Sequence, residues 1–183
     1  MTTAEPTAVA SAASPLEGDG FRNVVETYGQ RLYALAYRMT GNAHDAEDLV
    51  QESFLRAYRH RRHFQGRSSL CTWLYRICTN AALDHLRSRK HAGSAQPEIE
   101  ACVSPGASPE RLLLSRELCL RLRAAMASLS ARERAAFILR HYEGQSLENI
   151  GAILGLRTAA TKNTVFRAVR KLRTALASQR GAA

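Results

Sequence analysis

The sequence lacks several features that would place it in common classes of protein. Its four cysteines, Cys71, Cys78, Cys102 and Cys119, form no CxxC pair, and they are too few for a disulfide framework in a chain of 183 residues. No apolar run approaches the length of a membrane span, and residues 1–20 lack the basic start and apolar centre of a secretion signal. We therefore expect a cytoplasmic protein without membrane insertion, whose segment 1–20 is a disordered tail.

One spacing among the cysteines is compatible with a metal site. Cys71, Cys78 and His85 recur every seven residues and would share one face of a helix. No fourth ligand lies nearby in sequence, and the three residues border an apolar stripe that begins at Leu70. We therefore expect ordinary packing at this face, with no metal and no cofactor.

Charge is distributed unevenly along the chain. Residues 21–90 carry twelve Lys and Arg against six Asp and Glu, and residues 111–183 carry fourteen against four. The segment between them, His91 to Glu110, contains three glutamates and no Lys or Arg. Blocks with net charges of +6 and +10, joined by such a tether, indicate two footprints on one polyanion, most simply nucleic acid. We predict domains at 21–90 and 110–178, each with a small core of its own, and a flexible linker at 91–109.

Apolar periodicity is helical throughout, and no segment shows the alternation of a β-strand. The first block predicts helices at about 21–39, ended by Gly41, at 42–60 with Asn42 as the cap, and at 70–89. The second block contains several boundary signals: Ser108-Pro109 as a helix start, Ser130 and Glu133 as a capping box, then a helix at 146–154, a break at Gly155 and a helix at 158–176. This last pair has the helix-turn-helix pattern.

The polar face of that final helix suits contact with DNA. It carries Lys162, Asn163, Phe166, Arg167 and Arg170. A solvated basic face is the alternative interpretation. An exposed phenylalanine among short polar and basic residues, however, suits base edges and thymine methyl groups in a major groove better than it suits water.

The helix at 70–89 carries a different pattern beside its apolar stripe. Trp73, Arg76 and Asn80 fall within one sector, directly after the small loop 64–69. Exposed backbone donors beside an aromatic and basic face can stack and hydrogen-bond bases that have left a duplex. Trp73 is equally compatible with a core position.

The helix at 42–60 is acidic within a basic block. Asp48, Gln51 and Glu52 share one face, and carboxylates there would repel phosphate. A solubilising surface is one explanation. A protein partner rich in arginine is the explanation that we favour.

These motifs together resemble a known family. The run from Asp45 to Phe54, then Phe64-x-Gly66 and the stretch from Thr72 to Ile77, resembles region 2 of extracytoplasmic-function (ECF) sigma factors of bacterial RNA polymerase. The stretch from Leu129 to Arg134, with Glu143-Gly-x-Ser146 and Phe166-Arg167-Ala168, resembles region 4. The resemblance implies an all-α fold of two small helical domains, a region 2 bundle and a region 4 helix-turn-helix, and a protein that is not an enzyme.

The resemblance also implies partners and residue roles. Asp48, Gln51 and Glu52 would bind the clamp helices of the largest polymerase subunit, and region 4 would bind the flap of the second largest. An anti-sigma factor would control the protein and could hold it at the membrane. The minus-10 promoter element would be melted and read by Phe64, Gly66, Arg67, Ser68, Ser69, Trp73, Arg76 and Asn80. The minus-35 element would be read by Lys162, Asn163, Phe166, Arg167 and Arg170.

The recognition helix departs from the family pattern. Members of the family usually have Gly-Thr-Val-Lys-Ser-Arg where this chain has the stretch from Ala159 to Thr164. Thr161 replaces an apolar residue and Thr164 replaces an arginine, so we expect altered packing and an unusual minus-35 sequence.

Two other classes of protein remain open. A helix-turn-helix repressor or response regulator would explain the second block but not the acidic face of the first. An enzyme acting on nucleic acid would need clustered carboxylates, P-loop glycines or a nucleophile–base pair, and none of these occurs at a usable spacing.

Overall fold

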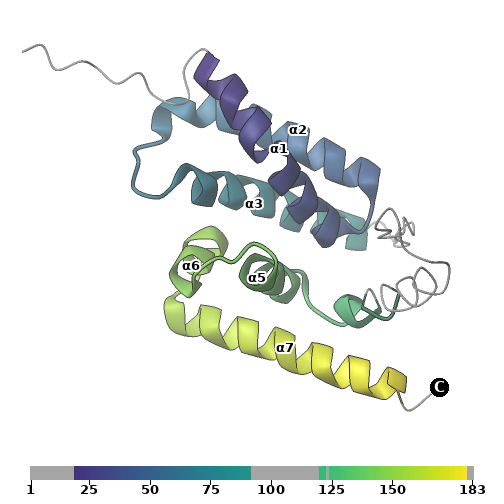
Figure 1. The fold of residues 1–183 in the computed structure, drawn as a ribbon. Helices are drawn as coiled ribbons and strands as arrows, with labels where there is room; N and C mark the ends of the chain where they lie inside the picture. Colours follow the sequence, from purple (N-terminus) through teal and green to yellow (C-terminus); the bar gives the residue numbers. More distant parts are fainter. Residues whose placement is uncertain (1–18, 92–119, 123, 181–183) are drawn as a thin grey trace, which may run out of the picture.

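The computed structural model describes residues 19–91, 120–122 and 124–180. Within these ranges all regular structure is helical, as the sequence predicts. The first half contains α1 (Asp19–Thr40), α2 (Ala43–His60), the short 3-10 helix η1 (Arg61–His63) and α3 (Leu70–His91), and the second half contains α5 (Ala131–His141), α6 (Leu147–Leu154) and α7 (Thr158–Arg180) (Figure 1). Residues 120–122 and 124–127 are helical too, and we count them with the second half. The predicted start at Ser108-Pro109 and almost all of the tail and linker lie outside the described residues.

The first half is a bundle of α1, α2 and α3. Most apolar positions of α1 are buried or half-buried, with Leu32, Leu35 and Met39 fully inaccessible to solvent, whereas Val25 is exposed. The turn between α1 and α2 has the expected signals: Gly41 takes a φ of 74°, and the Asn42 side chain accepts a 2.9 Å hydrogen bond from the Asp45 N–H. These contacts fix the angle at which α2 leaves α1.

The second half is built around the predicted helix-turn-helix. The capping box of Ser130 and Glu133 starts α5, and the Ser146 side chain caps α6 by accepting from the Asn149 N–H at 3.1 Å. Gly155 ends α6 in the left-handed conformation, at a φ of 65°. Such a conformation strains residues with a Cβ, so glycine at this position makes the sharp turn into α7 possible.

The two halves pack against each other, which differs from the expectation of two separate cores. In Figure 1, α5 and α6 lie between the bundle of α1 and α3 on one side and α7 on the other. The largest buried cluster accordingly crosses the boundary between the halves, joining residues such as Leu35 and Leu74 to Ile138, Ile150 and Leu154. The reason is that α5 and α6 bury side chains on two faces. The width of an apolar stripe in the sequence does not show how many other helices pack against that helix, or from which half of the chain they come.

Polar contacts also join the halves. Glu143, in the turn between α5 and α6, accepts hydrogen bonds from Arg38 Nη1 at 3.1 Å and from the Tyr75 hydroxyl at 2.6 Å. The Arg38 guanidinium lies 4.5 Å from the centre of the Tyr142 ring, a cation–π geometry. From α5, Arg134 Nη1 donates to the Met39 carbonyl at 2.8 Å. The boundary between the halves is therefore both apolar and hydrogen-bonded.

Candidate nucleic-acid and polymerase interfaces

The acidic face of α2 lies on the outside of the first half. Asp48 and Gln51 are exposed, and the half-exposed Glu52 accepts a 2.6 Å hydrogen bond from Arg56 Nε one turn later. The three predicted residues are thus brought together on one accessible face. Leu55 follows Gln51 by four residues and Glu52 by three. Its side chain is 51% exposed and adds an apolar group to this face. The helical spacing of Leu55 from Gln51 and Glu52 indicates in the sequence that it shares their face, although it was not among the predicted site residues.

The predicted single-strand surface lies at the loop before α3 and on α3 itself. Gly66, Arg67 and Ser68 are exposed, as are Arg76 and Asn80. Ser69 has a structural task in addition, because its hydroxyl accepts the Thr72 N–H at 3.1 Å and so caps α3. The polar members of this set are therefore all accessible, and Arg76 and Asn80 lie one turn apart on the same face of α3.

The two aromatic members of the set, Phe64 and Trp73, are half-buried. Their ring centroids are 5.2 Å apart at an interplanar angle of 45°, and both pack against the main core. Trp73 thus packs against the core on one side and remains partly exposed on the other. A partly exposed ring that is fixed by a neighbouring ring can still offer an edge or a face to an unstacked base.

A strongly basic segment precedes this loop and was not singled out from the sequence. Between Glu52 and Asp84 the chain contains no acidic residue. Arg59, Arg62 and Arg67 are exposed and take part in no ion pair among the described residues. Their unpaired charges make this end of the bundle attractive to phosphate. The long interval without Asp or Glu is the sequence signal that indicates this basic surface.

The outer face of α7 carries the predicted duplex-reading residues. Lys162, Asn163, Arg167 and Arg170 are all exposed, and Phe166 is 65% exposed, an unusual position for so large an apolar side chain. On another side of α7, Ala168 and Leu172 are buried in a cluster with Ala125 and Leu129. The predicted division of α7 into a buried and a polar face is confirmed.

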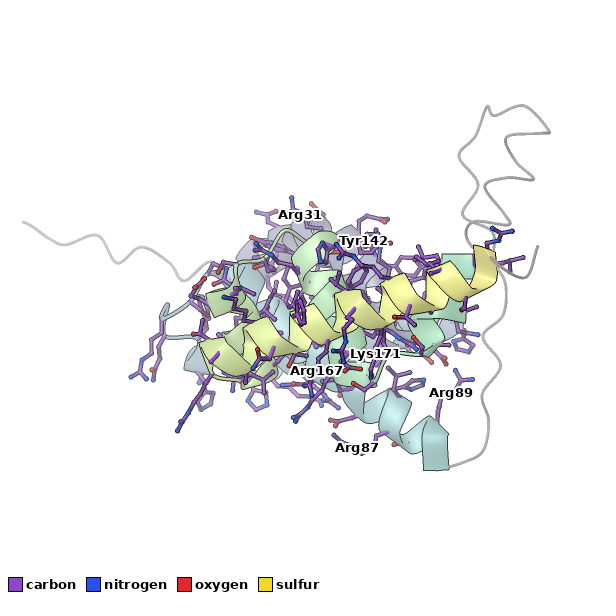
Figure 2. The ribbon with its side chains drawn as sticks, turned by 90° about the horizontal axis from the view of Figure 1, so that it is seen from below. Arg31, Arg87, Arg89, Tyr142, Arg167 and Lys171 are labelled. Carbon is purple, nitrogen blue, oxygen red and sulfur yellow. The ribbon has the colours of Figure 1, made fainter. Side chains whose placement is uncertain are left out.

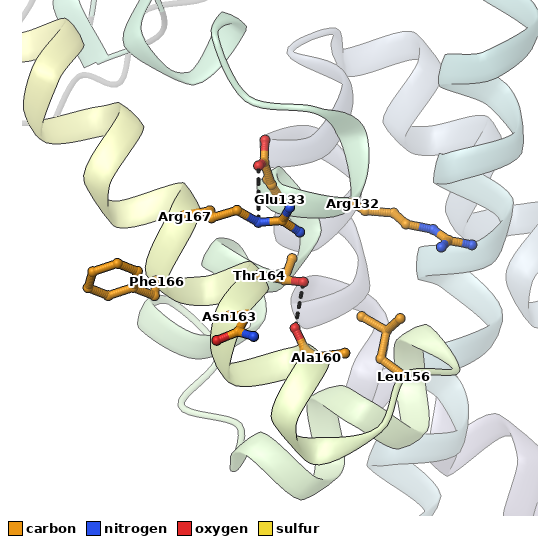
Figure 3. Close-up of a pocket in the computed structure, with 8 residues that line it drawn as sticks. All are labelled: Arg132, Glu133, Leu156, Ala160, Asn163, Thr164, Phe166 and Arg167. Carbon is orange, nitrogen blue, oxygen red and sulfur yellow. Dashed lines mark hydrogen bonds and ion pairs between the residues drawn. The ribbon is translucent and has the colours of Figure 1, made fainter.

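A hollow of about 460 Å³ lies between α5 and the start of α7 (Figure 3). Asn163, Phe166 and Arg167 line it from α7, and Arg132 and Glu133 line it from α5. Apolar and polar groups thus converge on an open concave surface.

The two atypical threonines of α7 are well accommodated. Thr161 is fully buried and donates to the Arg157 carbonyl at 3.1 Å, and Thr164 is nearly buried and donates to the Ala160 carbonyl at 2.8 Å. Because each hydroxyl bonds within its own helix, neither leaves an unsatisfied polar group in the interior. Thr161 packs closely against α6 at Gly151, where an added Cβ would lie 2.8 Å from the Leu156 carbonyl oxygen and 3.2 Å from Thr161 Oγ1.

Glu133 is a charged residue that sequence reasoning treated only as part of a capping box. Its side chain is 7% exposed, and its Oε2 accepts hydrogen bonds from the Ser130 N–H at 2.9 Å and from Lys171 Nζ at 2.7 Å. Burial by itself raises the pKa of Glu133, but the hydrogen bonds from Lys171 and Ser130 outweigh it and hold this pKa below the ordinary value. Glu133 is therefore a carboxylate at neutral pH.

The helix face with Cys71, Cys78 and His85 was weighed above as a metal site. Cys78 is fully buried and His85 lies 3.3 Å from Asp45, on the side of α3 that faces α2. Among the residues that the structure describes, no three His, Cys, Asp or Glu side chains are grouped so that they could hold a metal ion. In the same part of the chain, no helix is long and apolar enough to cross a membrane.

Comparison with known proteins gives two family matches. Sigma-70 region 2 matches residues 24–92, and sigma-70 region 4 matches residues 119–172. These ranges contain the acidic face of α2, the loop before α3 and the helix-turn-helix as far as residue 172 of α7. Together the two matches cover more than half of the chain.

Individual relatives agree with these matches. The ECF RNA polymerase sigma factor SigW of Bacillus subtilis is 33% identical over 164 residues, which cover 85% of this chain and 88% of that protein. The ECF RNA polymerase sigma-E factor of Salmonella typhimurium is 36% identical over 157 residues, covering 81% and 82%. Among solved structures, the sigma factor RpoE of Bartonella quintana, in complex with the anti-sigma factor NepR, superposes with a TM-score of 0.70 at 26% identity, covering 87% of this chain and 98% of that one. The chain belongs to the ECF sigma factors of bacterial RNA polymerase.

Proposed function

We propose that three surfaces divide the work of this sigma factor among them. Asp48, Gln51 and Glu52 on α2 bind the clamp helices of the largest subunit of core polymerase. The minus-10 surface, which comprises the loop 64–69 with Trp73, Arg76 and Asn80, melts and reads the minus-10 element. The minus-35 surface, which comprises Lys162, Asn163, Phe166, Arg167 and Arg170 on α7, reads the minus-35 element.

The observation that carries the proposal is the separation of charge on the first half. The acidic face of α2 and the basic minus-10 surface are both exposed, and they occupy different helices of one bundle. A surface of carboxylates suits an arginine-rich protein, whereas unpaired guanidiniums beside aromatic rings suit single-stranded DNA. One small bundle can therefore bind polymerase and DNA at the same time.

The packing of the halves on each other implies an opening step. Reading two promoter elements requires the minus-10 and minus-35 surfaces to move apart, and the contacts of Glu143 and Arg134 across the boundary must then break. A linker of about 19 residues reaches at most ~60 Å, which is under two turns of duplex. Region 4 binds the polymerase flap in the opened state. The free energy of this binding offsets the loss of the contacts between the halves.

We further propose that an anti-sigma factor controls the protein. Support comes from the structural relative RpoE, which was solved with the anti-sigma factor NepR. A partner that grips both halves would stabilise the packed arrangement and keep the chain from polymerase. The protein would act in the cytoplasm, and a membrane-anchored anti-sigma factor would hold it at the membrane.

Transcription with purified core polymerase tests the proposal. With the chain added, core polymerase should start transcription at new sites on fragmented genomic DNA of the source organism. On such a promoter, Asn80→Ala should still form closed complexes but lose the permanganate reactivity of unpaired thymines. Arg167→Ala should weaken binding to duplex promoter by about 1–3 kcal/mol, yet leave transcription from a preformed bubble intact.

Two results would contradict the proposal. One is the absence of any new start site when core polymerase and the chain are combined. The other is equal damage by Arg167→Ala to bubble and duplex templates, since duplex reading and single-strand reading would then not be separate. A nanomolar, sequence-specific duplex complex formed by the chain without polymerase would favour the repressor class instead.

A further inference from the structure

A buried carboxylate lies beneath the basic face of α7. Glu133 belongs to α5, yet its Oε2 is 2.7 Å from Lys171 Nζ and its Oε1 is 4.0 Å from Arg167 Nε. Arg167 and Lys171 are four residues apart and emerge along the same edge of α7 (Figure 2). One acid from a neighbouring helix therefore faces two basic residues of the helix that carries the minus-35 surface.

The geometry leaves the outer end of Arg167 free. Glu133 faces the Nε atom, and neither Nη group has a hydrogen-bond partner among the described residues. Figure 3 shows the guanidinium lying across the wall of the hollow, close to Glu133 and on the same helix as Phe166 and Asn163. The Nη groups are those that a bidentate contact with guanine O6 and N7 uses.

A fixed anion behind a flexible arginine has two physical consequences. First, it restricts the guanidinium before DNA arrives, so less side-chain freedom is lost on binding a base. Second, it cancels part of the positive charge that would otherwise attract any phosphate, whatever the sequence. The first effect favours the right base, and the second disfavours binding without sequence preference. Both raise discrimination.

We propose that Glu133 is a positioning residue for sequence reading, which orients Arg167 toward a guanine of the minus-35 element and suppresses nonspecific attraction to the duplex. This inference rests on the proposed role of α7 in reading that element. It adds to that role a residue from outside the helix-turn-helix. It also accounts for a carboxylate that is nearly buried beside a DNA-binding face, where a capping box could equally use glutamine.

The test compares base preferences of variants within the holoenzyme. Full-length chain with core polymerase is incubated with duplex promoter fragments in which the minus-35 region is randomised, and the bound fragments are sequenced. Glu133→Gln keeps an oxygen that accepts the Ser130 N–H but removes the charge that faces Arg167. Glu148→Gln is the matched control, because it removes one acid from a fully exposed site at the start of α6. Arg167→Ala identifies the base position that depends on Arg167.

The expected result is specific to one position. Glu133→Gln should reduce the preference for guanine at the Arg167-dependent position by roughly 3- to 10-fold, and leave the other positions as in the wild type. Its binding to scrambled duplex should strengthen at low salt, with a slope of log affinity against log salt that is steeper by up to about 0.9. Glu148→Gln should leave the preference unchanged. A structural role alone would lower affinity at every position and would not strengthen binding to scrambled DNA.

Three outcomes would overturn the inference. If Arg167→Ala changes the preference and Glu133→Gln does not, Glu133 has no positioning role, although α7 still reads the element. If Arg167→Ala changes no position, the proposed reading by Arg167 fails and the inference fails with it. If Glu133→Gln weakens all sequences equally, its effect is on folding.

Lys171→Met provides a second variant that does not disturb the start of α5. It removes the competing cation, so that Arg167 is the one cation still paired with Glu133, whose Oε2 continues to accept the Ser130 N–H. The preference at the Arg167-dependent position should be kept or sharpened, while binding to scrambled duplex weakens. A flattened preference in this variant would overturn the inference, because it would mean that Lys171 rather than Glu133 orients the arginine.

Discussion

The Tyr75 hydroxyl of α3 donates a 2.6 Å hydrogen bond to Oε2 of Glu143, across the boundary between the halves. Oε1 of the same carboxylate accepts from Arg38 of α1, and the Glu143 side chain is 9% exposed. One residue of the second half therefore joins two helices of the first. Since water has little access to this carboxylate, losing either partner leaves a poorly compensated polar group.

Glu143→Gln should weaken the contact between the halves. Because a hydrogen bond to a charged group is worth about 1.5–3 kcal/mol, we expect the free energy of unfolding to fall by about that amount, measured by urea denaturation. Small-angle scattering should show a larger radius of gyration. Glu148→Gln serves as the control, since it makes the same change at an exposed side chain. In a double-mutant cycle with Tyr75→Phe, a coupling energy near zero would contradict direct contact between the two side chains.

Stability should fall at high pH through Tyr75. Burial, followed by its hydrogen bond to the Glu143 carboxylate, raises the pKa of Tyr75 well above the ordinary value of 10.0. The unfolded chain then releases this proton at lower pH than the folded chain does. The contribution of Tyr75 is thus fully present below pH 10 and is lost above it, by about 1.4 kcal/mol per pH unit. Tyr75→Phe should remove this slope from urea-unfolding data between pH 9 and 11.5, and an unchanged slope would refute the assignment.

Glu52→Lys should fold normally but fail to co-purify with core polymerase. The ion pair that it breaks, with Arg56, is half-exposed and is worth only about 0.3–0.5 kcal/mol. A reversed charge at an interface, in contrast, repels the arginine-rich partner directly. Glu26→Lys makes the same change at an exposed site of α1 and should bind polymerase normally. Undiminished co-purification of Glu52→Lys would remove α2 from the polymerase interface.

Gly151→Ala and Gly29→Ala should have opposite effects. The new Cβ at Gly151 would lie 2.8 Å from the Leu156 carbonyl oxygen, a backbone atom that cannot move aside without shifting the turn before α7. We expect a loss of about 1–3 kcal/mol in the free energy of unfolding and weaker binding to duplex promoter. At Gly29, within α1, nothing lies within 4 Å of the added Cβ, so greater helix propensity should stabilise the chain by about 0.5–1 kcal/mol. Thermal melting of both variants checks the pair.

The helices and their ends could be predicted because the determinants are local. Asn42, the capping box of Ser130 and Glu133, and Gly155 each act on backbone groups within a few residues, and the structure confirms all of them. The exposed face of α7 follows in the same way from helical spacing. Local signals of this kind need no knowledge of what lies opposite.

The contacts that join distant residues could not be predicted in this way. Glu133 has the right spacing from Ser130 for a cap, and nothing in the sequence links it to Lys171, which is 38 residues away. The bond from Tyr75 to Glu143 spans 68 residues in the same manner. Helical spacing places Trp73 at the edge of the apolar stripe, so the sequence is compatible with either a core or a surface position. How far its ring is buried depends on packing with Phe64, which lies outside the helix.

The main apolar cluster contains residues of α1, α2 and α3 together with residues of α5 and α6. In the packed state, this makes the two halves a single cooperative unit, so thermal unfolding should follow one transition with equal calorimetric and van't Hoff enthalpies. A fragment that ends after α3 would uncover apolar surface normally covered by Ile138 and Ile150, and it should self-associate. In the opening step proposed above, the same apolar surface would become exposed whenever the halves part on polymerase, so each round of initiation would include a state that is prone to self-association.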